Sequence, residues 1–154
     1  MLKKNKWIFI FTLISLISFD QWTKELALRF LSNGSIVELT PFCNLVLVFN
    51  KGISFGWLNA SGILGTWLII VATTLISFWL IFMIYKCSKK HEMYGYTLVL
   101  AGAIGNIIDR FMHKAVVDFI HFHYQSFSFP VFNGADSFIT CGAVLIIAER
   151  LWHD

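Results

Sequence analysis

Four stretches of the chain are dominated by apolar residues, and shorter, more polar or alternating segments separate them. The apolar stretches cover residues 7–31, 61–85, 93–111 and 134–151, and the second carries no charge. Each is long enough to cross a hydrocarbon core of about 30 Å as a helix. We therefore expect a mainly α-helical membrane protein with four transmembrane helices, forming one domain over residues 1–154.

The first stretch follows a cluster of lysines and so resembles a secretory signal peptide. No small-residue cleavage site follows it, however, and apolar residues continue at helical spacing to residue 31. We therefore expect an uncleaved helix that contains Asp20 and Lys24.

The two longest segments between the helices have a different pattern. Residues 36–55 and 116–132 are rich in β-branched and aromatic residues, partly alternate, and contain Pro41 and Pro130. This pattern is typical of short strands bounded by turns. We expect them to form a small β-element outside the membrane. Its aromatic side chains would form an apolar cradle over a bound molecule, and they are Phe42, Phe49, Phe55 and Trp57.

The composition strengthens the assignment to a membrane. Of 154 residues, 57% are hydrophobic and 14% are charged, whereas an average soluble domain is about 45–50% apolar and about 25% charged. Disorder, a fibrous repeat and a polar soluble enzyme are excluded. The net charge of +3 is too small and dispersed to indicate a nucleic-acid partner. The three widely spaced cysteines predict neither a disulfide framework nor a metal site.

Basic residues predict the orientation of the chain. They concentrate before the first helix, between the second and third helices, and after the fourth, at Lys3, Lys4, Lys6, Lys86, Lys89, Lys90 and Arg150. By the positive-inside rule both termini are cytoplasmic and the strand segments face outward.

Several polar residues fall at one predicted depth. Asp20, Asn106, Asp109 and Asp136 lie 12–15 residues from the cytoplasmic ends of their helices, which is about 18–22 Å along the helix axis. Asp20 could simply pair with Lys24 at i,i+4. Ionisable groups on separate helices at one depth nevertheless favour a functional site in the outer third of the membrane.

The available residues narrow the chemistry of such a site. Ser137 lies beside Asp136, but no serine has a nucleophile-elbow pattern around it. His121 and His123 share one strand face, yet no third metal ligand has suitable spacing. Carboxylates remain: of two close together, one holds a proton while the other acts as a base and activates water without a metal.

Five short motifs, in order along the chain, resemble those of bacterial lipoprotein signal peptidases (signal peptidase II). They are residues 20–24 (DQWTK), 50–55 (NKGISF), 101–110 (AGAIGNIIDR), 116–119 (VVDF) and 132–137 (FNGADS). Ala101 and Ser54 replace a Gly and an Ala of the family pattern. Both replacements are small, so close packing should survive.

The resemblance implies an aspartic endopeptidase with Asp118 and Asp136 as the catalytic pair. It also implies residues that support the site or bind substrate: Asp20, Lys24, Asn50, Gly52, Asn106, Asp109, Arg110 and Asn133. The implied substrates are prolipoproteins, cut on the amino side of a diacylglyceryl-modified cysteine. Membrane lipid and globomycin-type inhibitors would be the other partners. We expect a monomer without metal or cofactor, in the bacterial cytoplasmic membrane, with its site near the outer face.

Two other functions remain open from the residues alone. In a small proton- or ion-coupled transporter, Asp20, Asp109 and Asp136 would line an ion path. However, transporters usually show internal repeats and a site near the midplane, and this sequence has no repeat. In a binding or assembly protein, the polar cluster would only hold helices together, and its carboxylates would tolerate replacement by Asn.

Overall fold

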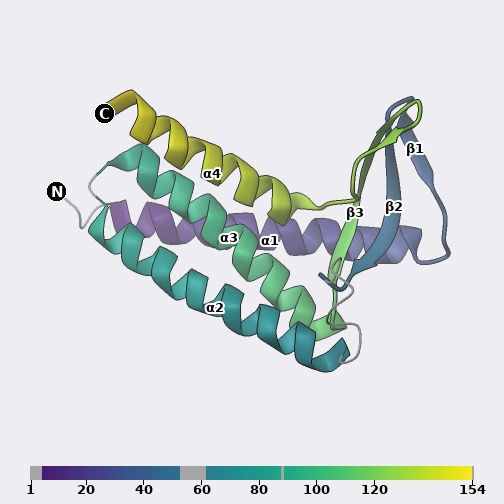
Figure 1. Ribbon diagram of the computed structural model, residues 1–154, viewed down its shortest axis with the longest axis horizontal. Coiled ribbons are helices and arrows are strands. Elements are labelled where there is room, and N and C mark those ends of the chain that lie inside the picture. The colour runs from purple at the N-terminus through teal and green to yellow at the C-terminus, as the bar shows by residue number, and fades with distance from the viewer. Residues whose placement is uncertain (1–4, 53–61, 88, 154) are drawn as a thin grey trace.

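Four long helices form a bundle, with both chain ends at one end and a small sheet at the other (Figure 1). The computed structural model describes residues 5–52, 62–87 and 89–153. The helices are α1 (Asn5–Leu31), α2 (Gly62–Lys86), α3 (Lys90–His113) and α4 (Gly134–His153). Their bounds agree with the four predicted stretches to within three residues, so the prediction of a mainly helical fold is confirmed.

Helix α3 lies in the centre and packs against the other three helices. Its contact with α4 is close because small residues meet: a Cβ at Gly142 would lie 2.6 Å from the carbonyl oxygen of Gly95, and one at Gly102 would collide with the carbonyl oxygen of Ala135. Ala101, which departs from the family pattern, is completely buried. Small residues therefore set the spacing of α3 and α4.

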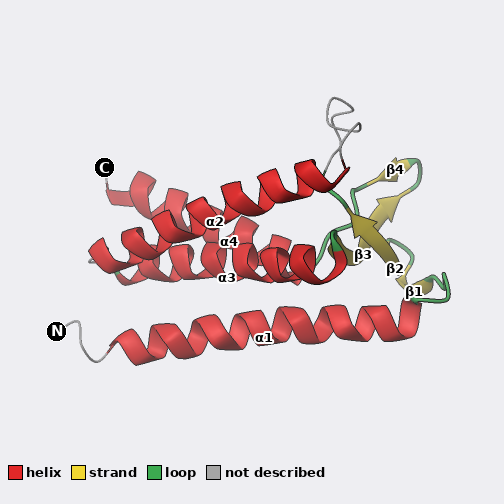
Figure 2. Ribbon diagram, turned by 90° about the horizontal axis from the view of Figure 1, so that it is seen from below, coloured by secondary structure: helices red, strands yellow, loops and turns green. Residues whose placement is uncertain are grey.

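The strands form an antiparallel sheet in the order β1-β2-β3-β4, beyond one end of the helices (Figure 2). They are β1 (Val37–Thr40), β2 (Cys43–Asn50), β3 (Val116–Tyr124) and β4 (Phe127–Ser128). The prediction of a small β-element is therefore confirmed. Within it, Val48 of β2 lies opposite Asp118 of β3. An isolated bridge joins Ile120 to Phe132, which places the residues just before α4 beside β3.

The distribution of polar and apolar residues is the reverse of that in a soluble protein. On α1, Trp7 and Trp22 are 76% and 58% exposed, whereas Asp20 and Lys24 are buried. Within the part of the chain that the structure describes, only residues Leu64–Lys86 are both long and apolar enough to qualify as a span, with a mean hydropathy of 2.4. Buried polar residues lower the hydropathy of the other helices.

Part of the predicted cradle can be located. Phe42 and Phe49 are exposed on the sheet. Phe55 and Trp57, and Ser54 of the second motif, lie outside the described residues.

Candidate active site

A buried lysine on α1 is surrounded by acceptors. Lys24 Nζ lies 2.8 Å from Asp20 Oδ2 and 2.8 Å from Asp109 Oδ2, and the three side chains are at most 2% exposed. Lys24 also donates a hydrogen bond to Asn106 Oδ1, at 3.0 Å. These three contacts use the three donors of the ammonium group. The Asp20–Lys24 pair at i,i+4 does form, but as part of a charged triad that joins α1 to α3.

The two carboxylates of this triad also hold the backbone of other elements. Asp20 Oδ1 accepts a hydrogen bond from the backbone N–H of Ala135, at 2.8 Å, in the first turn of α4. Asp109 Oδ2 accepts one from the backbone N–H of Val117, at 3.1 Å, at the start of β3. Gln21 Nε2 donates to Asp20 and to Asp109 Oδ1. The triad therefore positions the two segments that carry the predicted catalytic residues.

The start of α4 fixes one of those residues. Asn133 directly precedes the helix, and its Oδ1 accepts a hydrogen bond from the backbone N–H of Asp136, at 3.0 Å. In return, Asp136 Oδ2 accepts one from the backbone N–H of Asn133, at 3.2 Å. Such a reciprocal pair is a capping box.

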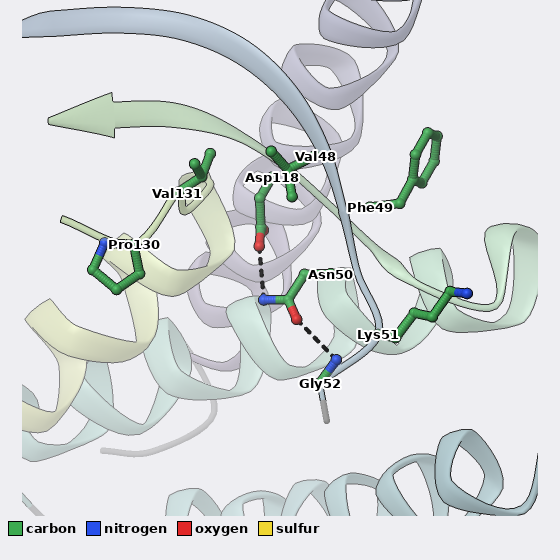
Figure 3. Close-up of a pocket in the computed structure, with 8 residues that line it drawn as sticks. All are labelled: Val48, Phe49, Asn50, Lys51, Gly52, Asp118, Pro130 and Val131. Carbon is green, nitrogen blue, oxygen red and sulfur yellow. Dashed lines mark hydrogen bonds between the residues drawn. The ribbon is translucent and has the colours of Figure 1, made fainter. Parts of the chain in front are cut away.

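The other predicted catalytic residue, Asp118, projects from β3 toward the segment that follows β2 (Figure 3). Its Oδ2 accepts a hydrogen bond from Asn50 Nδ2, at 2.9 Å, and its Oδ1 accepts one from Asn133 Nδ2, at 2.6 Å. The backbone N–H of Gly52 donates to Asn50 Oδ1, at 2.8 Å. Gly52 has φ +72°, a left-handed conformation that glycine adopts without strain.

Asp118 lies at the edge of a cavity of about 400 Å³. The residues that line this cavity are Val48, Phe49, Asn50, Lys51, Gly52, Asp118, Pro130 and Val131. Burial raises the pKa of Asp118 from 3.8 to about 6, and the hydrogen bond from Asn50 opposes this rise, whereas the negative charge of Asp136 adds to it. A carboxyl group in this state can exchange a proton near neutral pH.

Asn106 joins the buried triad to the pair of aspartates. Its Oδ1 accepts from Lys24 and, at 3.3 Å, from Asn133 Nδ2, while its Nδ2 donates to Asp136 Oδ1 at 2.9 Å. Arg110 Nη1 donates to the backbone oxygen of Asn106. All ten residues predicted for the site from the sequence therefore belong to one connected network. They come from α1, β2, α3, β3 and α4, and from the segments just after β2 (Gly52) and just before α4 (Asn133).

Sequence reasoning missed two residues that the site requires. Gln21 bridges Asp20 and Asp109, and Gly105 leaves room for Asp20, because a Cβ at Gly105 would collide with Asp20 Oδ2. Both residues lie inside the motifs quoted above, so their place in those motifs was the available signal.

The family model described as "Signal peptidase (SPase) II" matches residues 12–152. The chain belongs to the signal peptidase II family. A lipoprotein signal peptidase of Rickettsia felis is 39% identical over 140 residues, which cover 91% of this chain and 71% of the relative. One of Thermodesulfovibrio yellowstonii is 42% identical over 132 residues, 86% of either chain.

A solved bacterial membrane enzyme has the same fold as this signal peptidase II family member. The two chains are 32% identical with a TM-score of 0.85, and the match covers 95% of this chain and 94% of the other. A second such enzyme is 29% identical with a TM-score of 0.78. The resemblance predicted from five motifs is confirmed, and the family favours a membrane-bound peptidase over the transporter.

Proposed function

We propose that the chain removes signal peptides from diacylglyceryl-modified prolipoproteins, as an aspartic endopeptidase that cuts on the amino side of the lipidated cysteine. The observation that carries this proposal is the linkage of Asp118 and Asp136 through one residue, Asn133, beside an open cavity: its side-chain Nδ2 donates to Asp118, and its backbone N–H donates to Asp136. Family membership supplies the substrate class, since the relatives are named lipoprotein signal peptidases.

The two aspartates would share the acid–base work. The Asp136 carboxylate, at a helix N-terminus, takes a proton from a water molecule that attacks the scissile carbonyl carbon. Asp118, whose buried carboxyl holds a proton more readily, donates a hydrogen bond to the carbonyl oxygen as the tetrahedral intermediate forms. The C–N bond then breaks, and the leaving amine receives the proton that Asp136 took from water. No metal is needed in this scheme.

The lipid anchor of the substrate requires a site that opens toward the membrane. We propose that all four helices span the bilayer, because α1, the longest with 27 residues, and α4, the shortest with 20, are about 40 and 30 Å long. The termini would be cytoplasmic, and the sheet and cavity would face outward. Acyl chains could then stay in lipid while water reaches the aspartates. We expect a monomer, and inhibition by globomycin-type compounds that occupy the same site.

The test is cleavage of a lipid-modified prolipoprotein by the purified full-length chain in lipid. Asp118→Asn and Asp136→Asn keep the size of the side chains and remove the acid–base function, so each should lower kcat about 10³-fold or more. Glu25→Gln is a matched control, because Glu25 is an exposed carboxylate of α1, and should cleave like the parent chain. Either Asn variant cleaving at the parent rate would contradict the catalytic assignment.

The orientation has its own test. Topology reporters placed at Lys89, between α2 and α3, and at His121, in β3, should report opposite sides of the membrane. Reporters on the same side would contradict the proposed topology while leaving the catalytic assignment in place.

A further inference from the structure

We propose that Lys24 is a positioning residue that fixes the direction of the Asn106 side-chain amide, and so makes Asn106 a hydrogen-bond donor to Asp136. The inference rests on the proposed catalytic role of Asp118 and Asp136. Lys24 itself contacts Asp20, Asp109 and Asn106. It would therefore act on the reaction through Asn106.

The direction of the Asn106 amide follows from the chemistry of its neighbours. An ammonium group can donate hydrogen bonds but cannot accept them. The Asn106 atom 3.0 Å from Lys24 Nζ must therefore be the oxygen. The amide nitrogen then faces Asp136 Oδ1, 2.9 Å away. Asn133 Nδ2 donates to the same oxygen, but at 3.3 Å and as a neutral amide. Without Lys24 the Asn106 amide keeps only this longer contact, so it turns over more readily and then faces Asp136 with its oxygen, which repels the carboxylate.

The other amides around the pair are fixed by the same logic. Asn133 Oδ1 accepts from the backbone N–H of Asp136, and Asn50 Oδ1 accepts from that of Gly52. Because backbone N–H groups only donate, the nitrogens of both amides face Asp118.

Each of the four carboxylate oxygens of the pair consequently accepts one N–H. Two of the three side-chain amides are oriented by backbone within a few residues of them. The third, Asn106, is oriented by side chains alone: its Oδ1 accepts from Lys24 of α1 at 3.0 Å and from Asn133 at 3.3 Å. Of these two donors, Lys24 is the one that makes no contact of its own with either aspartate, so changing it can alter the proton affinity of the pair without touching the pair.

Replacing Lys24 removes a positive charge as well as the donor to Asn106, so the two changes must be separated. Among the described residues, the charged groups around the pair are Lys24 and Asp20 on α1, Asp109 and Arg110 on α3, Lys51 in the lining of the cavity, and the pair itself. The triad of Asp20, Lys24 and Asp109 has a net charge of −1. Lys24→Met/Asp20→Asn has the same net charge but lacks the donor to Asn106, whereas Asp20→Asn alone keeps the donor and removes one negative charge.

The experiment is the pH dependence of kcat/KM for cleavage of a lipid-modified prolipoprotein by the full-length chain. A hydrogen bond to a charged group corresponds to about one pH unit or slightly more. In Lys24→Met/Asp20→Asn, the acidic limb should move about one unit to higher pH, because the Asp136 carboxylate loses its donor. In Asp20→Asn the limb should stay in place or move to lower pH.

The conservative pair Lys24→Gln/Asp20→Asn completes the series. A glutamine amide can donate to Asn106 or accept from it, so it should restore part of the shift. If the Met variant is not recovered folded, the Gln variant carries the test, with an expected shift of less than one unit but above zero. An unmoved acidic limb in the variants that fold would overturn the inference.

The outcomes for Lys24 and for the pair are distinguishable in the same assay. If Asp118→Asn and Asp136→Asn still cleave, the proposed function fails, and the inference fails with it. If both lose cleavage while the Lys24 series leaves the acidic limb unmoved, the inference alone fails, and Lys24 serves only to hold the helices together.

Discussion

The molecule contains two pairs of aspartates that belong to one network of contacts yet are satisfied in opposite ways. Asp20 and Asp109 share one ammonium group, that of Lys24. The carboxylates of Asp118 and Asp136 accept one hydrogen bond per oxygen, each from an amide of the described residues. The first pair is enclosed by helices and holds the start of β3 and α4, whereas the second lies where those elements meet, and Asp118 borders the cavity.

This difference indicates how the molecule separates stability from reactivity. A carboxylate that contacts a buried lysine is tied by an ion pair to the element that carries the lysine. A carboxylate held by neutral amides in a buried place can gain or lose a proton at moderate cost. The pair bound to Lys24 is therefore suited to structure, and the pair held by amides to acid–base chemistry. Substitutions that break one kind of contact should leave the other measurable.

The largest effect on stability should come from Lys24→Met. It leaves two buried carboxylates without a cation, which typically costs about 3–5 kcal/mol. The measurement is the free energy of unfolding in detergent, followed by tryptophan fluorescence. Adding Asp20→Asn should recover part of the loss, because one of the two carboxylates is then gone. If Lys24→Met alone were as stable as the parent chain, the triad would not contribute to the stability of the fold.

The second largest effect should be a fall in the unfolding free energy of the parent chain as the pH rises, at least about half as large as the loss in Lys24→Met. The pKa of Asp118 is about 6 in the folded chain and 3.8 in its ordinary state, so the folded state binds this proton more tightly than the unfolded state. The stability it contributes is complete below pH 4 and is lost as the pH rises to about 6. The difference is on the order of 3 kcal/mol.

Asp118→Asn removes this titration and provides the control. Its unfolding free energy should lack the fall between pH 4 and 6 that the parent chain shows. Equal slopes in the two proteins would mean that Asp118 is not the group responsible.

Much of this arrangement could be predicted from the sequence. The apolar stretches fixed the helices to within three residues, and helical rise alone placed Asp20, Asn106, Asp109 and Asp136 at one level, where their contacts join them. These predictions succeed because they depend on periodicity and length, which are local properties of a chain.

Other features depend on long-range contacts and could not be predicted from local pattern. The position of a residue along its helix does not show that Asp109 accepts a hydrogen bond from the backbone N–H of Val117. It also does not show that Gln21 lies between two carboxylates. Nor does hydropathy distinguish the helices that carry the site. The polar residues of α1, α3 and α4 lower the hydropathy of these helices, and α2, which contributes none of the ten site residues, is the described helix that qualifies as a span by composition.

A smaller loss of unfolding free energy, about 1–3 kcal/mol, should follow from Gly105→Ala because the added methyl group overpacks the site. The new methyl group would meet the Asp20 carboxylate and push it from Lys24. Gly134→Ala is the matched control, since its methyl group would lie 3.4 Å from the other oxygen of Asp20. It should change the unfolding free energy little. Equal losses in the two variants would indicate that space at Asp20 does not limit the triad.

The smallest effect should come from an ion pair on the same helix with the same spacing. Glu25 and Arg29 are i,i+4, as Asp20 and Lys24 are, with 2.7 Å between Arg29 Nε and Glu25 Oε1, but their side chains are 53% and 70% exposed. Exposed pairs of this kind contribute about 0.3–0.5 kcal/mol. Glu25→Gln should therefore lower the unfolding free energy by no more than that amount, and high salt should remove the difference. A loss close to that of Lys24→Met would mean that spacing along α1, and not burial, decides the strength of these pairs.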